Sequence, residues 1–425
     1  MATTGTTALS NLMRQTLNPQ VQKAFVNEPI LMMMLENALS STKVNARGED
    51  ITIRTGPSAS FGALGESALL PVSGSPVYSK FNILNKLHYA QGEISGLAWL
   101  MQDVDTIGKG KVREVAGMLG ELIDGETGDF KQKLNRFAYG TGNGALGSPI
   151  TAVTVGASGT ATINPAASLN GSNQIPLGAR VNFYSSGGVA HVAGAAVSTV
   201  TAINTTTGVT TFDSVPTDAV VTDIIVFENS YGNCMTGLRG LVQNSNITFQ
   251  NVNVTNLPNL KANIVDAAAA NWSQGLIDRA ITRTKTASGI NRPVDDFVIL
   301  THPKQSDAVR NAGYALNTAT IGSDRSKEKL DLGFPLISTN GMRIREDVDC
   351  GQSEMWGLRM STLQRYALFE PGLMEIFPGQ MLAPKPGSSN YYHIYQYAFA
   401  FIGNLAVNNP AANFTITNLA YSALG

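Results

Sequence analysis

Residues 111–140, KVREVAGMLGELIDGETGDFKQKLNRFAYG, decide how this chain is organised. Their apolar side chains recur at spacings of three and four residues, the stripe of an amphipathic helix. They are Val112, Val115, Leu119, Leu122, Ile123, Phe130, Leu134 and Phe137. A helix of this length spans about 45 Å. Each internal glycine weakens it by roughly 1 kcal/mol relative to Ala, so the stripe has to be buried against another element.

The segment before this helix predicts a long β-hairpin. Apolar residues alternate in ITIRT at 51–55 and in VYSKFNILNKLHYAQGEIS at 77–95, while residues 56–76 between them are rich in Gly, Pro and Ser. A compact domain rarely contains so long a connection without secondary structure, and an isolated two-stranded ribbon is marginally stable in water. The hairpin is therefore expected to need a partner surface.

The first 50 residues indicate an arm that packs on another part of the protein. Residues 1–10 are rich in Thr, Ala and Gly and are expected to be extended. Short helices broken near Pro19 and Pro29 should follow. The apolar run ILMMML, Ile30 to Leu35, is far too short for a membrane span and predicts a buried helical turn.

The composition changes after the long helix. From residue 148 to about 230, short β-rich runs alternate with Gly, Ser, Asn and Pro turns, and the segment contains one Arg, no Lys and four acidic residues. This predicts a small all-β barrel or sandwich inserted between two α/β parts.

The chain then returns to mixed structure. The pattern predicts a helix from about 259 to 286, a strand in DDFVILTHP at 295–303, a helix at 304–313 and strands at 335–340 and 342–347. Near the end, aromatic rings and one imidazole alternate along the chain, which predicts a strand with one buried face. They are Tyr391, His393, Tyr395, Tyr397, Phe399 and Phe401.

Charge and cysteine content exclude several classes of protein. Charged residues form 14% of the chain, below the roughly 25% that is usual, so much of the surface is expected to be covered by neighbouring subunits. Thirty basic and 31 acidic residues without a basic run argue against specific binding to duplex DNA. Cys234 and Cys350 stand far apart, which indicates a reducing compartment and neither a disulfide framework nor a zinc site. No secretory signal and no membrane span is recognisable.

Glycine motifs give no phosphate site. Gly142, Gly144 and Gly147 spell GxGxxG but follow a helix, whereas a dinucleotide fingerprint follows a strand, so we interpret them as a helix stop and hinge. GKGK at Gly108 to Lys111 lacks the remainder of a P-loop and is interpreted as a turn.

Catalytic and metal-binding patterns are equally weak, and we predict no catalytic, cofactor-binding or metal-ligating residue. The four histidines, His88, His191, His302 and His393, lie in four different segments, and no GxSxG elbow occurs. Acidic groups occur at Asp103/Asp105, Asp295/Asp296 and Glu346/Asp347/Asp349. Each could bind calcium or share a proton, but we expect them to be solvated or paired with arginines such as Arg343 and Arg345. The terminal aromatic strand contains no basic residue at 391–401, which favours packing over base stacking.

In this order the segments resemble the Hong Kong 97 phage fold of tailed-bacteriophage major capsid proteins, an α+β fold. The resemblance covers nearly the whole chain. The stretches that carry it are KFNILNKLHYAQGEIS (80–95), KLNRFAYGTGNG (133–144), DDFVILTHPKQSDAVR (295–310), MRIREDVDCG (342–351), LQRYALFEPG (363–372) and YQYAFAFIGNLAVNNPAA (395–412).

The resemblance implies six parts. They are an N-terminal arm (1–50), an extended loop (51–90), a spine helix with part of the peripheral domain (91–147), an inserted all-β domain (148–232), an axial domain (233–370) and a C-terminal return to the peripheral domain (371–425). The insertion departs from the minimal fold.

The resemblance also implies a structural, non-enzymatic subunit that assembles with itself into hexamers and pentamers of an icosahedral virion head in the host cytoplasm. Expected partners are packaged DNA held non-specifically, a portal and a separate scaffolding protein, with no membrane, and the presence of a decoration protein stays open. Because only about 50 residues precede the hairpin, no N-terminal cleavage is expected.

Some relatives join Lys to Asn between subunits. The conceivable partners in this chain are Lys80 or Lys86 with Asn404, Asn408 or Asn409, although any surface carries such residues. Three alternatives stay open: another virion part such as a tail tube or decoration protein, an encapsulin-like compartment, and an enzyme. The long helix argues against the first, and the lack of a catalytic motif argues against the third.

Overall fold

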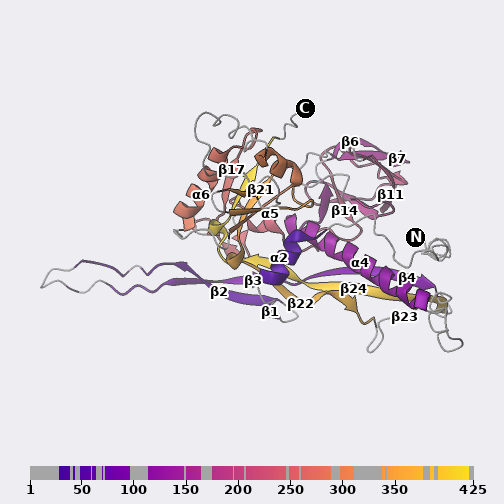
Figure 1. Ribbon diagram of the computed structural model, residues 1–425, viewed down its shortest axis with the longest axis horizontal. Helices are drawn as coiled ribbons and strands as arrows, with labels where there is room; N and C mark the ends of the chain where they lie inside the picture. The colour runs from indigo at the N-terminus through magenta and orange to yellow at the C-terminus, as the bar shows by residue number, and fades with distance from the viewer. Residues whose placement is uncertain are drawn as a thin grey trace, which may run out of the picture.

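The computed structural model shows three large sheets, one long helix and a protruding hairpin (Figure 1). The residues that it describes are 28–38, 42–43, 48–58, 60–63, 69, 72–95, 113–147, 150–163, 175–194, 196–204, 207–245, 248–257, 260–288, 297–310, 337–339, 342–376, 383–386 and 391–420.

The long helix α4 (Arg113–Tyr139) lies along one face of a five-stranded sheet (Figure 1). The strands are β1 (Thr42–Lys43), β22 (Leu363–Met374), β24 (Tyr391–Val407), β23 (Ala383–Pro386) and β4 (Lys86–Ser95). Phe130 of α4 stacks on Phe399 of β24 with ring centroids 6.3 Å apart. Tyr397, Phe399 and Phe401 are fully buried. Both the helix and the one-sided strand predicted from periodicity are confirmed.

The second sheet is the inserted all-β part. Its eight strands run in the order β5-β14-β9-β11-β12-β8-β6, with β10 paired to β9. Their bounds are β5 (Ala145–Gly147), β6 (Ile150–Thr154), β8 (Thr160–Ile163), β9 (Arg180–Tyr184), β10 (Ala190–His191), β11 (Ser198–Ile203), β12 (Val209–Phe212) and β14 (Ile224–Phe227). A two-stranded ribbon of β7 (Gly156–Ala157) and β13 (Ser214–Val215) accompanies them.

The ends of this second sheet approach each other. Ile150 of β6 exchanges backbone hydrogen bonds with the segment that enters β14: its N–H donates to Asp223 O at 3.1 Å and its C=O accepts from Thr222 N at 3.0 Å. The interior holds the edge-to-face pair Phe183 and Phe212, 5.3 Å between centroids. The sheet therefore curls into a nearly closed barrel, one of the two predicted shapes.

The third sheet is mixed and six-stranded, in the order β17-β25-β21-β18-β20-β19. Its strands are β17 (Asn263–Asp266), β25 (Phe414–Thr417), β21 (Met355–Arg359), β18 (Phe297–Thr301), β20 (Met342–Glu346) and β19 (Ile337–Thr339). Helix α6 (Gln274–Ser288) contacts β17 and β25, and a further helix covers residues 303–310.

Small elements connect these layers. They are α2 (Ile30–Ala38), α5 (Leu238–Leu241), the ribbon β15 (Thr248–Phe249) with β16 (Val252–Asn253), and the 3-10 turns η4 (Met360–Thr362) and η5 (Pro410–Ala412). Leu31 and Leu35 of α2 are fully buried, which confirms the helical turn predicted in the arm.

The protruding hairpin consists of β2 (Glu49–Gly56) and β3 (Val77–Ile83), which pair from Glu49 opposite Ile83 to Gly56 opposite Val77. It extends away from the rest of the molecule (Figure 1). The predicted second arm was too long, because the chain leaves the ribbon after Ile83 and β4 joins the first sheet from Lys86 onward.

Other boundaries also differ from the sequence expectation. The helix expected at 259–286 begins only at Gln274, since residues 263–266 form β17 in parallel register with β25. The expected division at residue 370 falls within β22, which belongs to the first sheet, while β25 lies in the third. Pairing between distant segments overrides local pattern at these points.

One apolar core runs through all three sheets. It contains Phe399 from the first, Phe183 from the second and Trp356 from the third. A second cluster, which includes Ile277 of α6, fills the space between that helix and the third sheet. The sheets are thus joined by shared packing.

Close packing inside the third sheet gives a stability prediction. Gly357 lies in β21 between β18 and β25, and a Cβ added there would stand 2.2 Å from the ring of Phe414. We expect Gly357→Ala to lower the free energy of unfolding by about 1–3 kcal/mol. The matched control is Gly128→Ala on α4, where nothing lies within 4 Å of an added Cβ. That change should raise stability by about 0.5–1 kcal/mol. Urea unfolding of the unassembled chain measures both, and equal effects would contradict the packing.

Candidate assembly surfaces

The hairpin exposes large apolar side chains to solvent. Phe61 and Leu69 are each 93% exposed and Val72 is 89% exposed. Val77 and Tyr78, at the start of β3, are more than half exposed. An exposed apolar surface of this kind marks an interaction site in a soluble protein. The hairpin is therefore the first candidate contact surface.

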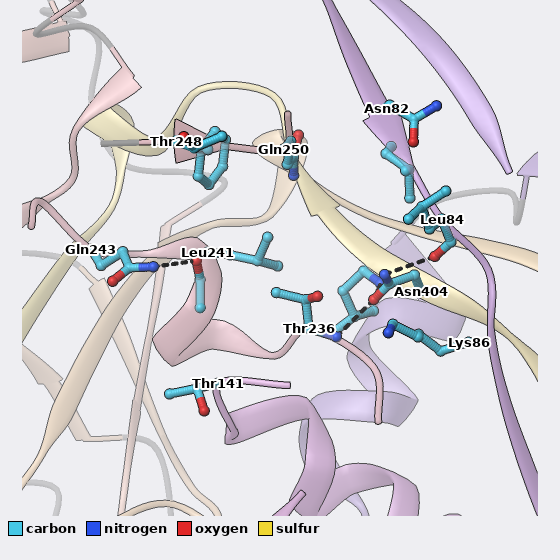
Figure 2. A pocket seen from close by; sticks show the side chains of 14 residues that line it. Asn82, Leu84, Lys86, Thr141, Thr236, Leu241, Gln243, Thr248, Gln250 and Asn404 are labelled. Atoms are coloured by element: carbon cyan, nitrogen blue, oxygen red, sulfur yellow. Dashed lines mark hydrogen bonds between the residues drawn. The ribbon is translucent and has the colours of Figure 1, made fainter. Parts of the chain in front are cut away.

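The base of the hairpin is fixed to the body of the protein. Phe81 is fully buried and meets Phe249 edge to face at 5.5 Å between centroids. The backbone N–H of Asn82 donates to Gln250 O at 3.1 Å. Asn404 of β24 holds the exit of the hairpin, because its Nδ2 donates to Leu84 O at 2.9 Å (Figure 2). These contacts set the direction in which the hairpin projects.

A cavity of about 360 Å³ lies beside this base (Figure 2). Two of its polar side chains bond to the protein: Lys86 Nζ donates to Gly232 O at 2.8 Å, and Gln243 Nε2 donates to Gly240 O at 2.8 Å. The buried side-chain amide of Gln250, another lining residue, has no hydrogen-bond partner among the described residues. Asn404 Oδ1 accepts from Thr236 N at 2.8 Å, as Figure 2 shows. Because Asn404 also holds the exit of the hairpin, the wall of this cavity is part of the anchor of the hairpin.

A second exposed apolar surface lies on the first sheet. Leu84, Leu87 and Tyr89 are 53–56% exposed, and Leu87 and Tyr89 point to the same side of β4. His88 alternates with them and faces α4, where its ring centroid lies 5.8 Å from that of Phe137. Leu87 and Tyr89 of β4, with Leu84 just before the strand, form the second candidate contact surface, which we call the β4 row.

A buried polar cluster joins the arm, the long helix and the third sheet. Asp347 follows β20, and its Oδ2 accepts from Leu31 N at 3.2 Å, Asn135 Nδ2 at 3.1 Å and Tyr139 OH at 2.9 Å. Asn135 Oδ1 in turn accepts from Met32 N at 3.0 Å. The first turn of α2 has unpaired backbone N–H groups, so side chains from two distant segments cap the arm helix.

A second carboxylate completes this cluster. Asp349 Oδ2 accepts from Asn135 Nδ2 at 2.7 Å, and the backbone N–H of Asp349 donates to Asp347 Oδ1 at 2.9 Å. Burial raises the pKa of Asp349 to about 6, with a further rise from the charge of Asp347. Burial also raises the pKa of Asp347 and lowers the pKa of Arg136 to about 9. We call Asn135, Tyr139, Asp347 and Asp349 the joint cluster.

The structure corrects the expectation for the acidic triplet. Asp347 and Asp349 are buried in the joint cluster, and neither is solvated or paired with Arg343 or Arg345. Glu346 accepts from Ser306 Oγ at 2.7 Å and pairs with Arg310. The alternation of β20 sends both Arg343 and Arg345 to solvent, away from the aspartates.

The histidines lie apart in the structure. His88 is buried, its Nε2 accepts from Met235 N at 3.1 Å, and burial with the charge of Lys86 lowers its pKa to about 4. Burial also lowers the pKa of His302 to about 4. His191 bridges Asp218 and Asp223 at 3.1 and 3.0 Å from opposite sides of its ring.

Among the described residues no group of three His, Cys, Asp or Glu side chains is arranged to hold a metal ion. Within the same residues no helix is long and apolar enough to span a membrane. Asp103, Asp105, Asp295, Asp296 and the GKGK turn lie outside the described residues, as does the side chain of His393.

The remaining motif residues have structural positions. Gly142 and Gly144 have φ of +96° and +81° just after α4, which agrees with the helix-stop interpretation. Of the conceivable cross-link partners, Lys80 is exposed, whereas Asn404 is buried and hydrogen-bonded through both ends of its amide. Asn404 thus holds the hairpin in place and is not available to a neighbour.

Loss of the joint cluster should loosen the arm. Asp347→Ala removes the acceptor shared by Leu31, Asn135 and Tyr139, and we expect it to lower the free energy of unfolding by about 3 kcal/mol. Asp347→Asn keeps an acceptor oxygen and should cost clearly less. Urea unfolding gives the energies, and the rate of tryptic cleavage after Lys43 reports on the arm. Equal stability and equal cleavage of both variants and wild type would refute the capping role.

Two buried groups should give opposite pH dependences. The native pKa of Asp349, about 6, lies above the unfolded value of about 3.9, so the folded chain binds more protons there. Its contribution to stability is full below about pH 4 and is lost as pH rises through about 6. The native pKa of His88, about 4, lies below its unfolded value of about 6.5. Its contribution is full above about pH 6.5 and is lost on acidification toward 4.

Single variants separate these contributions. Asp349→Asn should lose more stability than wild type when the pH falls from 6.5 to 4.5, and His88→Gln should lose less. Urea midpoints at the two pH values measure the difference. Parallel pH profiles for all three proteins would show that neither group titrates as described.

No protein-family model matches the sequence, and no curated protein matches it. Among solved structures, the capsid asymmetric unit of cyanophage A-1(L) is 12% identical, covers 95% of this chain and 96% of its own, and has a TM-score of 0.56.

Two further structures are more distant. Gordonia phage Cozz is 13% identical over 98% of this chain and 94% of its own, with a TM-score of 0.45. The holo-SrpI encapsulin complex from Synechococcus elongatus PCC 7942 is 12% identical over 99% of this chain and 98% of its own, with a TM-score of 0.38. These two scores are too low to carry an argument. The cyanophage match at 12% identity establishes the fold alone, and the chain has the Hong Kong 97 fold of tailed-phage capsid proteins, which its sequence resembles.

Proposed function

We propose that this chain is the major capsid protein of a tailed phage, a structural subunit that assembles with copies of itself into pentamers and hexamers of a closed head. The observation that carries the proposal is the hairpin: its base is fixed by buried contacts, while Phe61, Leu69 and Val72 beyond that base are almost fully exposed. An exposed apolar hairpin whose base is fixed can be buried by contact with a second subunit.

The geometry suits repeated contacts of one kind between copies. The hairpin and the β4 row are two different surfaces of the same chain. When one surface of a subunit binds a different surface of the next, the subunits form a ring if the rotation between successive copies adds up to a full turn. Each contact buries a few apolar side chains and is weak alone. Many such contacts in one shell act together, which makes the assembly strong.

The proposed content of the shell is double-stranded DNA, held without sequence recognition. The formal net charge of −1 and the lack of a basic run are compatible with a near-neutral inner wall. A separate scaffolding protein and a portal belong to the same proposal. The inserted sheet is proposed to brace the capsomer or to receive a decoration protein.

Shortening the hairpin tests the function. Replacing residues 57–76 by Asn-Gly joins Gly56 to Val77, which already pair, through a turn of the type that closes two-residue hairpins. The folded subunit should persist with an unchanged urea midpoint, but closed particles should be lost. Electron microscopy and sedimentation of purified wild type and variant measure this.

Two results would oppose the proposal. One is a wild-type chain that stays monomeric at high concentration, alone and with co-expressed neighbouring gene products. The other is a shortened variant that forms shells as readily as wild type. Nuclease-protected DNA in wild-type particles separates a phage head from a compartment that holds protein cargo.

A further inference from the structure

A second cavity, of about 290 Å³, lies where the arm helix meets the long helix and the first sheet. Its lining residues are Pro29, Met32, Met33, Lys131 and Pro371. They come from the entry and first turn of α2, from α4 and from β22. We call this cavity the Met–Pro pocket.

The joint cluster holds one wall of this pocket in place. Met32 is 3% exposed, and its N–H donates to Asn135 Oδ1 at 3.0 Å. Met33 is 42% exposed, and its N–H donates to Pro29 O at 2.9 Å. Met32 therefore belongs to the core while Met33 reaches solvent. The pocket exists in this form only while α2 is docked on α4.

The lining chemistry selects an aromatic ring. Methionine sulfur makes favourable contacts with aromatic rings, and a lysine ammonium is attracted to a ring face. None of the five lining residues is acidic, and the side chains that line the pocket with Lys131 are apolar. A cavity of about 150 Å³ already accepts benzene, so the space suffices for a phenyl ring.

The chain carries a matching aromatic group. Among the described residues the exposed aromatic side chains are Phe61 at 93%, Tyr78 at 59% and Tyr89 at 53%. Phe61 is the most exposed and lies beyond the paired strands of the hairpin. β2 and β3 lead away from α2 and α4 (Figure 1), and the fixed base prevents the hairpin from folding back. Phe61 of the same copy therefore does not reach the pocket.

We propose that the Met–Pro pocket receives Phe61 from the hairpin of a second copy of this chain. The inference rests on the proposed function, because it names the surface on which one hairpin contact between copies forms. It also makes docking of the arm helix a condition for that contact, since α2 supplies the methionines. A copy whose arm helix is not docked on α4 has no pocket in which the Phe61 side chain of its neighbour could bind.

A pair of cysteine variants tests the contact directly. Phe61→Cys and Met33→Cys are made in separate chains, mixed during assembly and oxidised mildly. The natural thiols interfere little, because Cys234 and Cys350 are buried, and burial raises the pKa of Cys234 to about 12 and that of Cys350 well above its usual value. A disulfide-linked dimer is expected in the mixed shells on a non-reducing gel. Val189→Cys on the inserted sheet, 68% exposed, replaces Met33→Cys as the matched control and should give no dimer.

Assembly strength provides the second measurement. Phe61→Ala should raise the protein concentration needed for shell formation about tenfold or more, and Phe61→Tyr, which keeps a ring, should change it little. The urea midpoint of the unassembled chain should be the same for both, since Phe61 is exposed there.

The outcomes distinguish the two proposals. Wild-type shells without the Phe61–Met33 dimer, or with equal dimer from the Val189 control, overturn the pocket assignment and leave the shell function standing. Phe61→Ala shells that form at wild-type concentration do the same. A wild-type chain that forms no shell contradicts the proposed function, and this inference with it.

Discussion

The arrangement of this protein depends on one buried carboxylate. Asp347 accepts hydrogen bonds from the arm helix, the long helix and, through Asp349, its own loop after β20. Removing a carboxylate from water is costly unless its oxygens are satisfied, and here several donors converge on it. The arm, the long helix and the third sheet therefore hold one relative position, and that position shapes the Met–Pro pocket and supports the first sheet.

The exposed surfaces follow from what this body leaves uncovered. The first sheet buries one face under α4, and the hairpin leaves the body at a base that is fully packed. Among the described residues, the large apolar side chains beyond these points are exposed. Under the proposed function these groups would become buried by contact with other copies, and in a fixed direction because the anchors of the hairpin lie inside the core.

Elements with a strong local pattern could be predicted from the sequence, and elements made by distant contacts could not. The stripe of α4 and the alternation of β24 are repeated many times, so the type of both elements was predicted correctly. The predicted burial is confirmed for Phe130, Leu134 and Phe137 of α4 and for Tyr397, Phe399 and Phe401 of β24. β17 has only four residues and pairs with β25 about 150 positions away, and a helix was expected in its place. The joint cluster was missed for the same reason: Asn135 and Asp347 are 212 residues apart. The only local feature of this cluster in the sequence is the amide side chain of Asn135 beside the apolar stripe of α4, and an amide alone does not identify its partner.

The inserted sheet enters and leaves the body at a single place. β5 pairs with β14, so the chain departs after α4 and returns to α5 through adjacent strands. Everything between these two strands forms a curled unit whose ends already stand side by side. The unit shares its apolar core with the other two sheets, so changes of length are best tolerated at its exposed turns, where the path from α4 to α5 stays the same. The exposed turns of this unit therefore offer positions at which a foreign segment could be displayed without altering the route of the chain through the rest of the body.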